Sequence, residues 1–241
     1  MNFPKLPLKQ FAQVQERETA EAKYWKSFTN TQEHNLQAAP NCIHFNPLSK
    51  SNGSIDSTLH SNYIVTGSIK VGLYDCLTDK LQKAFSRFND DAFSGRFRKD
   101  GKLIVAGDKS GFVKVFDVQT KSVLRQLKRH TAAVRSTVWA SNGLQFISGS
   151  DDKRVFRWDL ATEELMWSSK DVHADYVRCV DSSPISSDVF VSGCYDHSVR
   201  LWDARQQQPI QVLKHPGPVE CTIFTPSGAL LLTASGNEMK V

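Results

Sequence analysis

The chain has 241 residues, of which 40% are hydrophobic and 23% are charged, a composition typical of a soluble globular protein. No apolar run approaches the ~18–20 residues that a helix needs to cross a membrane. The amino-terminal sequence also lacks the apolar core of a signal peptide. The formal net charge of +5 permits contact with RNA but does not require it. We therefore expect an intracellular protein that does not enter membranes.

The polar residues give no sign of a cofactor, a metal or a small-molecule substrate. Five cysteines are widely spaced without a Cys-x-x-Cys pair, which is typical of free thiols in a reducing compartment. Cys42 and His44 are near neighbours, but two ligands alone do not make a zinc site. The sequence contains neither a glycine-rich phosphate-binding loop nor a His-Glu-x-x-His motif.

Residues 1–40 are predicted to be an arm that carries a short helix. Residues 1–9 contain two prolines, and residues 10–28 are rich in helix formers with apolar side chains roughly on one face. The helix is expected to pack on the rest of the chain. The alternative is a docking segment for a partner, with Tyr24 and Trp25 as its aromatic anchors.

Residues 41–241 predict short β-strands in groups of four. Residues 49–61 are polar and predict an inserted loop, whereas Asp100-Gly101 and Asn142-Gly143 predict tight hairpin turns. The expected strands are CIHF, YIVTG, KVGLY and AFSRF; SGRF, LIVAG, FVKVF and VLRQL; VRSTVW, QFISG, VFRWD and ELMWS; VRCV, VFVSG, VRLWD and IQVLK; then VECTIF, LLLTA and MKV.

These groups repeat at a nearly fixed period. An aromatic residue followed by Asp closes four of them, at Asp75, Asp117, Asp159 and Asp203, so the spacings are 42, 42 and 44 residues. A period of about 40–45 residues that closes on Trp-Asp is typical of the WD40 β-propeller, an all-β fold with four strands per blade. We number the groups as blades one to five.

The fifth group stops early. Residues 239–241 match the start of a third strand, where blade four continues to Trp202-Asp203. A closed propeller has about four to eight blades. We expect an incomplete propeller over residues 41–241, truncated in the fifth blade, with about four and a half blades of seven.

Two blades contain a His, a Ser, an Asp and a Trp at matched positions. The set invites comparison with a hydrolase triad, but it recurs once per blade, whereas an active site is normally unique. It resembles the structural tetrad of WD repeats, in which the Asp holds the His, the His bonds the Ser and the Ser reaches the Trp indole. We therefore predict two structural networks, no catalytic residue and no enzyme. Their members are His130, Ser148, Asp152 and Trp158, and His173, Ser192, Asp196 and Trp202.

Two groups of cations are candidate contact residues. Arg135 and Arg178 are equivalent in blades three and four, and the likeness to WD repeats places them near the central channel, where partners dock. Arg96, Arg98 and Lys99 make blade two locally basic, so they are candidates for contact with RNA phosphates. For Arg135 and Arg178 the alternative is a solvated charge or an ion pair that contributes little, and for the basic residues of blade two it is an ordinary soluble rim.

Several stretches are more specific than the general WD pattern. They strongly resemble the U3 small nucleolar RNA-associated protein 15 family, and the likeness covers about residues 24 to 241. The stretches are FSRFNDDAFSGRFRKDGKLIVAGDKSGFVKVFDV, HADYVRCVDSSPISSDVFVSGCYDHSVRLWDAR and HPGPVECTIFTPSGALLLTASG.

This resemblance implies a nucleolar, hence nuclear, scaffold subunit of the small-subunit processome, which supports maturation of 18S ribosomal RNA. It also implies a link to ribosomal DNA transcription by RNA polymerase I. The implied partners are other processome WD-repeat proteins, the U3 ribonucleoprotein and pre-ribosomal RNA. Family members have seven blades and a helical carboxy-terminal domain, which this sequence lacks.

A different class of function is the alternative. Residues 202–205 read Trp-Asp-Ala-Arg and fit the WDxR box of WD-repeat substrate receptors of cullin-RING ubiquitin ligases. Arg205 would then bind the adaptor protein. A generic cytosolic signalling scaffold is a third possibility.

Overall fold

The computed structural model describes residues 39–47, 62–76, 78, 80–169 and 172–241. The chain divides into two compact units, Met1–Gln37 and Ala38–Val241, and all the described residues belong to the second. The expected amino-terminal helix, the anchors Tyr24 and Trp25, and the inserted loop at residues 49–61 lie outside the described residues.

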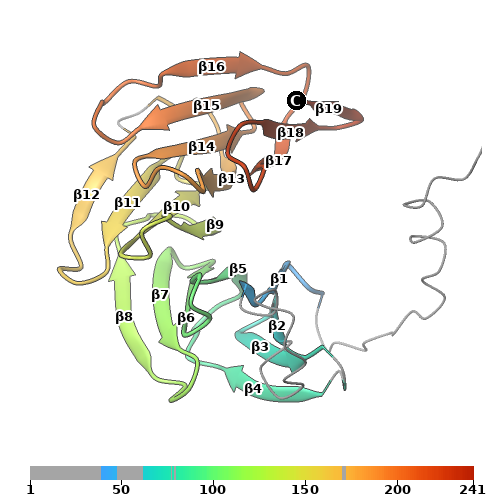
Figure 1. The fold of residues 1–241 in the computed structure, drawn as a ribbon, viewed down its shortest axis with the longest axis vertical. Coiled ribbons are helices and arrows are strands. Elements are labelled where there is room, and N and C mark those ends of the chain that lie inside the picture. The colour runs from blue at the N-terminus through green and yellow to red at the C-terminus, as the bar shows by residue number, and fades with distance from the viewer. Residues whose placement is uncertain (1–38, 48–61, 77, 79, 170–171) are drawn as a thin grey trace, which may run out of the picture. The chain divides into compact units, whose positions relative to one another are not determined.

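The described residues form five antiparallel sheets, one for each predicted blade, which confirms the all-β WD40 fold (Figure 1). Consecutive strands are neighbours in every sheet. Blade one contains β1 (Cys42–Phe45), β2 (Asn62–Gly67), β3 (Lys70–Asp75) and β4 (Leu81–Phe85). Blade two contains β5 (Ala92–Phe97), β6 (Leu103–Asp108), β7 (Phe112–Asp117) and β8 (Val123–Lys128). Blade three contains β9 (Val134–Trp139), β10 (Gln145–Ser150), β11 (Val155–Asp159) and β12 (Leu165–Ser168). Blade four contains β13 (Val177–Ser182), β14 (Val189–Cys194), β15 (Ser198–Asp203) and β16 (Gln211–Lys214), and blade five contains β17 (Val219–Phe224), β18 (Leu231–Ser235) and β19 (Glu238–Lys240).

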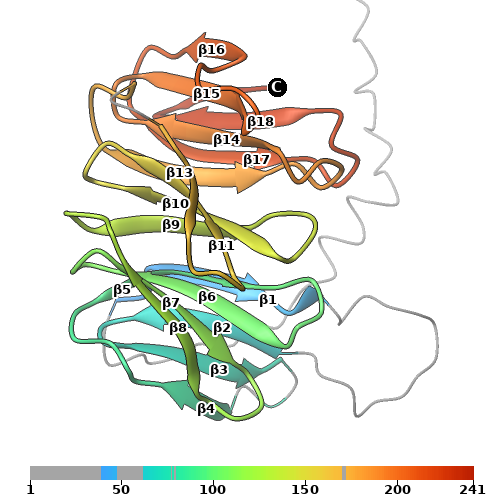
Figure 2. The same ribbon diagram turned by 90° about the vertical axis from the view of Figure 1, so that its left-hand side faces the viewer.

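Within this unit the first strand of each blade contacts the first strand of the next. Figures 1 and 2 show β5, β9 and β13 in succession, and in Figure 1 β8, β12 and β16 lie on the outside. Apolar side chains fill the space between neighbouring blades, as between blades three and four, where Ile147, Trp167 and Trp202 pack together. Burial of these apolar faces is the main force that holds one blade against the next.

The repeated Ser-Gly dipeptide has a packing reason. A Cβ atom on Gly149 would lie 2.8 Å from Cγ1 of Val177, and one on Gly193 would lie 2.7 Å from Cγ1 of Val219. In both cases the valine begins the first strand of the next blade. A side chain at either glycine would therefore push two blades apart.

The repeated closing Asp caps the turn between the third and fourth strands. Oδ1 of Asp159 accepts the N–H groups of Ala161 at 2.8 Å and Thr162 at 2.9 Å. Oδ1 of Asp117 accepts the N–H of Thr120 at 2.7 Å in the same way. Such Asx turns stabilise a tight change of direction, so the Asp is needed once per blade.

One predicted strand was misplaced. AFSRF was expected to close blade one, but β4 ends at Phe85. Phe88 instead turns into the core between blades one and two, where its ring centroid lies 5.3 Å from that of Phe116. Burial of the aromatic ring outweighs extension of the strand.

Candidate functional site

The tetrad of blade three forms one continuous hydrogen-bonded chain. Nδ1 of His130 lies 2.7 Å from Oδ2 of Asp152, and its Nε2 lies 2.8 Å from Oγ of Ser148. Oγ of Ser148 also accepts the indole N–H of Trp158 at 2.8 Å. Because the carboxylate accepts the Nδ1 proton, Nε2 is the acceptor for the Ser148 hydroxyl. Every member of this buried network is therefore paired.

Ionised Asp152 anchors the network. Burial opposes ionisation of its carboxyl group, but the hydrogen bond from His130 and the backbone N–H of Thr131 hold its pKa below the usual value. The imidazole of His130 stacks on Phe156, with the ring centroids 4.2 Å apart. The ring is thus fixed by two hydrogen bonds and by one apolar face.

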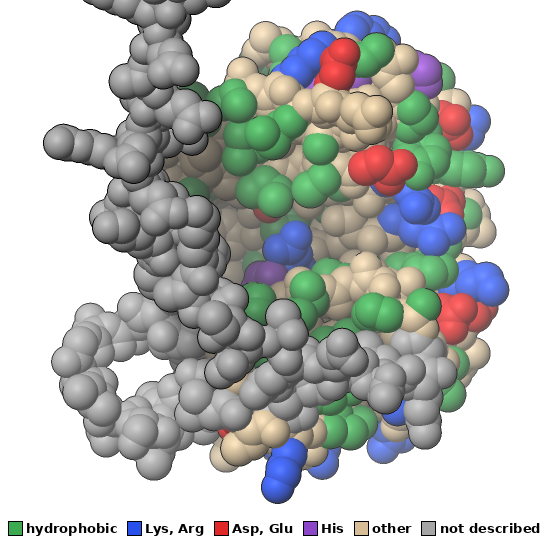
Figure 3. Space-filling view, turned by 90° about the vertical axis from the view of Figure 1, so that its right-hand side faces the viewer, with side chains coloured by type: hydrophobic (Ala, Val, Ile, Leu, Met, Phe, Trp, Pro, Cys, Tyr) green, Lys and Arg blue, Asp and Glu red, His purple; other side chains and the backbone are tan. Residues whose placement is uncertain are grey.

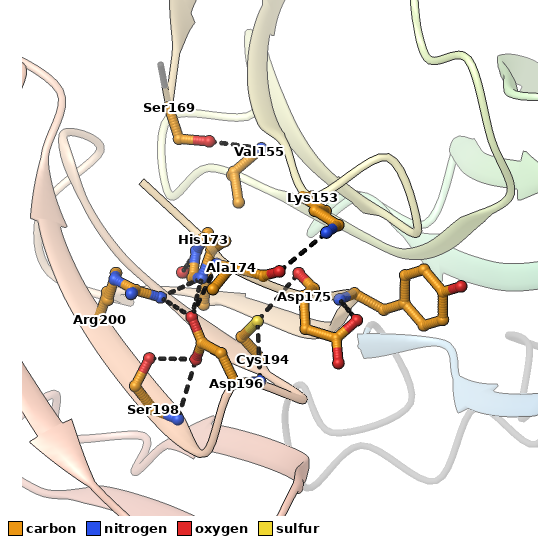
Figure 4. Close-up of polar contacts among 12 residues, drawn as sticks. Lys153, Val155, Ser169, His173, Ala174, Asp175, Cys194, Asp196, Ser198 and Arg200 are labelled. Atoms are coloured by element: carbon orange, nitrogen blue, oxygen red, sulfur yellow. Dashed lines mark hydrogen bonds and ion pairs between the residues drawn. The ribbon is translucent and has the colours of Figure 1, made fainter. Parts of the chain in front are cut away.

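Blade four departs from the predicted tetrad. Ser192 keeps its bonds to His173 Nε2 at 2.8 Å and to the Trp202 indole at 2.7 Å. Oδ2 of Asp196, however, lies 3.8 Å from Nδ1 of His173, too far for a hydrogen bond. Nη1 of Arg200 contacts that Nδ1 and lies 2.8 Å from Oδ2 of Asp196 (Figure 4). A buried cation therefore links the two residues that were expected to bond directly.

Because of Arg200, the ring proton of His173 lies on Nε2, whereas that of His130 in blade three lies on Nδ1. A guanidinium group only donates, so Nδ1 of His173 accepts and Nε2 carries the proton that is donated to Ser192. Burial and the charge of Arg200 lower the pKa of His173, although the carboxylate of Asp196 acts in the opposite direction. The lowered pKa keeps the ring neutral. In blade three Phe156 pairs with Ser148 at the position where Arg200 pairs with Ser192. Sequence reasoning missed Arg200, although the exchange of Phe for Arg at this position was visible.

His173, Cys194 and Asp196 offer three metal-ligand atoms within 4.8 Å of one another. They do not fit a divalent cation, since the Arg200 guanidinium already contacts two of them. Burial raises the pKa of Cys194 to about 11, whereas a metal ligand must be the thiolate. Figure 4 shows the guanidinium directed at His173 and Asp196.

The serine hydroxyls are unsuited to nucleophilic attack. Ser148 and Ser192 are both fully buried, and each Oγ already contacts a His and a Trp. A substrate cannot reach either oxygen without opening the core between the blades. The geometry therefore supports a role in holding each blade together.

Removal of one serine hydroxyl should destabilise the fold. Ser192→Ala leaves two buried N–H groups without an acceptor, and we expect a loss of about 1–3 kcal/mol in the free energy of unfolding. Urea denaturation measures it, with Ser168→Ala on half-buried β12 as a control that should change stability by less than about 0.5 kcal/mol. A fully stable Ser192→Ala protein that has lost a hydrolytic activity would contradict the structural role.

Blades two and five contain shorter polar networks in the strands that are equivalent to those of the tetrads. In blade two the side chain of Lys114 is buried, donates to the carbonyl of Arg87 and lies 3.9 Å from Asp108. In blade five Nε2 of His215 lies 3.0 Å from Oγ1 of Thr233. These residues were not predicted from the sequence, although His215 precedes its blade as His173 precedes blade four.

Arg135 and Arg178 meet at the start of the inner strands, where they line a cavity of about 180 Å³ with Glu220. Nε of Arg135 lies 2.7 Å from Asp151, and Nη1 of Arg178 lies 3.9 Å from the same carboxylate. Each guanidinium also covers an aromatic ring, Phe93 at 4.1 Å and Tyr195 at 5.0 Å. Oε1 of Glu220 accepts the Tyr195 hydroxyl proton at 2.6 Å. This convergence of side chains from blades two to five is the first candidate surface.

The other cationic candidates lie apart from this cavity. Arg98 is held by Asp100 at 2.5 Å and lies over the Trp139 ring at 5.8 Å, so its charge is used within the chain. Arg96 and Lys99 line a second cavity, of about 180 Å³. The guanidinium of Arg205 pairs with Asp203 at 2.5 Å, although 72% of its side chain is exposed.

Among the described residues, no helix is long and apolar enough to cross a bilayer.

Comparison with known proteins agrees with this architecture. The model of the WD domain, G-beta repeat, matches residues 121–159 and 168–203. The chain is 33% identical over 240 residues to the U3 small nucleolar RNA-associated protein 15 homolog of Xenopus laevis, and this covers 100% of the chain and 44% of the relative. It is 38% identical to Protein SLOW WALKER 1 of Arabidopsis thaliana, with 99% and 43% covered. It is 31% identical to U3 small nucleolar RNA-associated protein 15 of Saccharomyces cerevisiae, with 92% and 42% covered. The chain thus spans less than half the length of these relatives.

Proposed function

This chain belongs to the WD-repeat family of the U3 small nucleolar RNA-associated protein 15, and from this we propose that it is a non-catalytic scaffold in the nucleolar small-subunit processome. Sequence identity of 31–38% over nearly the whole chain to relatives from animals, a plant and yeasts supports the proposal. The scaffold would support processing of pre-ribosomal RNA to 18S RNA, and would contribute to the link with RNA polymerase I transcription of ribosomal DNA.

A scaffold role agrees with the chemistry of the two tetrads. Their buried hydroxyls and histidines are used by bonds within the blades, so they offer no group to a substrate. The relatives from Xenopus laevis, Schizosaccharomyces pombe and Saccharomyces cerevisiae are named for association with U3 small nucleolar RNA, and these names state no reaction. We therefore assign the chain to assembly rather than to catalysis.

The cavity lined by Arg135 and Arg178 is the proposed docking surface for a partner protein of the processome. Two guanidinium groups share the single carboxylate of Asp151, which leaves hydrogen-bond donors for acidic or carbonyl groups of a partner. The aromatic rings beneath them hold both side chains in place before a partner arrives. Arg is enriched at energetically dominant interface positions for these reasons.

The ubiquitin-ligase alternative rests on Arg205 alone. Its guanidinium is paired with Asp203, and the backbone N–H of Arg205 bonds the same carboxylate at 3.0 Å. Asp203 and Arg205 thus stabilise the turn that follows β15, as Asp159 and Asp117 do in blades three and two. The names of the relatives favour the processome over this alternative.

Co-purification tests the proposal and separates the two alternatives. An epitope-tagged copy of the protein should enrich U3 small nucleolar RNA and other processome WD-repeat proteins from cell extract. The Arg135→Ala/Arg178→Ala double variant should lose protein partners, whereas Arg205→Ala, the matched control, should retain U3 RNA. Enrichment of a cullin adaptor that disappears with Arg205→Ala, without U3 RNA, would reject the processome assignment.

A further inference from the structure

The second cavity combines cations with one carboxylate at the far ends of the inner strands. His44 on β1, Arg96 on β5 and Asp181 on β13 line it, together with Lys99 and the end of β9. Its volume is about 180 Å³. Figure 3 shows a hollowed face of this unit, in which a histidine side chain lies beside a cationic one. Four consecutive blades therefore contribute to one small site, whose charged side chains stand among apolar ones such as Phe97 and Trp139.

Arg96 is available to a ligand. Within the described residues no carboxylate lies within 4.0 Å of its guanidinium, and its side chain makes no hydrogen bond. Its backbone carbonyl accepts the Trp139 indole proton at 3.1 Å, so the backbone is fixed while the side chain is free to bind. Lys99, two residues beyond the end of β5, is exposed. A half-buried guanidinium beside an exposed ammonium is a typical phosphate contact.

His44 adds a neutral donor. Its Nδ1 accepts the N–H of Phe97 at 3.2 Å, which leaves the proton on Nε2. Burial, together with the charge of Arg96, lowers the pKa of His44 to about 4, so the ring stays neutral at physiological pH. The site thus offers three kinds of donor from three side chains.

Asp181 decides which anion fits. Its Oδ2 accepts the N–H of Phe224 at 2.7 Å, so a ligand hydroxyl would bond to Oδ1. An acidic peptide would bring a second carboxylate against this one, at a cost. A ribonucleotide brings a phosphate for the cations and a 2′-hydroxyl that donates to the carboxylate. The mixture of charges therefore favours RNA over both an acidic peptide and DNA.

We propose that this cavity binds the sugar-phosphate backbone of single-stranded RNA, with Arg96 and Lys99 on a phosphate and Asp181 on a ribose 2′-hydroxyl. The inference rests on the proposed function, since it makes the contact with RNA direct. It also separates Arg96 and Lys99 from Arg98, whose charge is taken up by Asp100.

Fluorescence anisotropy with the full chain tests the proposal. The probes are a labelled oligouridylate and the oligodeoxyuridylate of the same length, which differ only in the 2′-hydroxyl. The wild-type chain should bind the RNA more tightly. Arg96→Gln should weaken RNA binding about tenfold and reduce the slope of log K against log salt by about 0.7. Asp181→Asn should bring the affinities for RNA and DNA together.

Matched variants guard against a general loss of fold. Arg87→Gln removes an exposed Arg in the loop before β5, at the opposite end of that strand, and should leave RNA binding unchanged. If Arg96→Gln fails to fold, Lys99→Gln at an exposed position should give the same change of salt slope. Equal binding of RNA and DNA by the wild-type chain, unchanged binding by a folded Arg96→Gln, or displacement of RNA by polyglutamate at equal charge would each overturn the proposal.

The two proposals fail separately. A protein that enriches U3 RNA from cells but binds neither probe retains its scaffold role and loses this site. A chain that discriminates RNA from DNA as expected, in a protein that enriches no U3 RNA, keeps the site and loses the scaffold role.

Discussion

Asp196→Asn should lower the free energy of unfolding by about 3–5 kcal/mol, because it leaves the buried guanidinium of Arg200 without its carboxylate. Both side chains are more than nine-tenths buried, so water cannot replace the lost partner. Amide substitution keeps the shape of the side chain and removes only its charge. Urea denaturation followed by tryptophan fluorescence measures the change.

Asp152→Asn in blade three is the matched control. Its carboxylate lies 2.7 Å from Nδ1 of His130 with no guanidinium between them, and Phe156 stands where blade four has Arg200. We expect a loss of only about 1–2 kcal/mol there, since one hydrogen bond is weakened and no buried guanidinium loses its carboxylate. Equal losses of unfolding free energy for the two variants would show that pairing of Asp196 with Arg200 does not stabilise blade four.

The repeat period predicted the sheets well because each blade is specified locally. Glycine recurs where the next blade packs closely, and an aromatic residue recurs where the core between blades is filled. Asp recurs where a turn begins. These needs are the same in every blade, so they leave a periodic trace. Strand bounds differ by only a few residues, as with β4, where burial of Phe88 outweighs a strand propensity.

The insertion of Arg200 was not predicted because a consensus pattern fixes positions rather than distances. The sequence places His173 and Asp196 23 residues apart, one more than the 22 residues between His130 and Asp152, so the two pairs look equivalent. Whether the two side chains touch depends on what fills the third strand beside them. In blade four a long cation occupies that space, and the carboxylate moves to 3.8 Å from the ring.

The basic run of blade two was predicted as one patch, but the structure divides it. β5 ends at Phe97, so Arg98 is the first residue of the turn, and Asp100 in that turn pairs with it. Arg96 lies within the strand and lines the second cavity instead. Neighbouring cations in the sequence therefore have different partners, and counting charges could not separate them.

Depletion of the protein should sharply reduce 18S ribosomal RNA while the large-subunit RNAs are maintained. A scaffold of the small-subunit processome is needed only for the precursor of the small subunit, so the two RNA pools should separate. Northern analysis of both pools and their precursors measures the effect. A resistant wild-type copy supplies the control, because its expression should restore the 18S pool.

Rescue with Ser192→Ala tests the central claim most directly, because it separates assembly from catalysis. A scaffold whose serine only holds blade four together should restore 18S RNA when the variant is expressed to the wild-type level of folded protein. We predict that depletion reduces 18S RNA and that both copies restore it. Unchanged 18S RNA after depletion, or a folded Ser192→Ala protein that fails to restore it at matched abundance, would contradict the account.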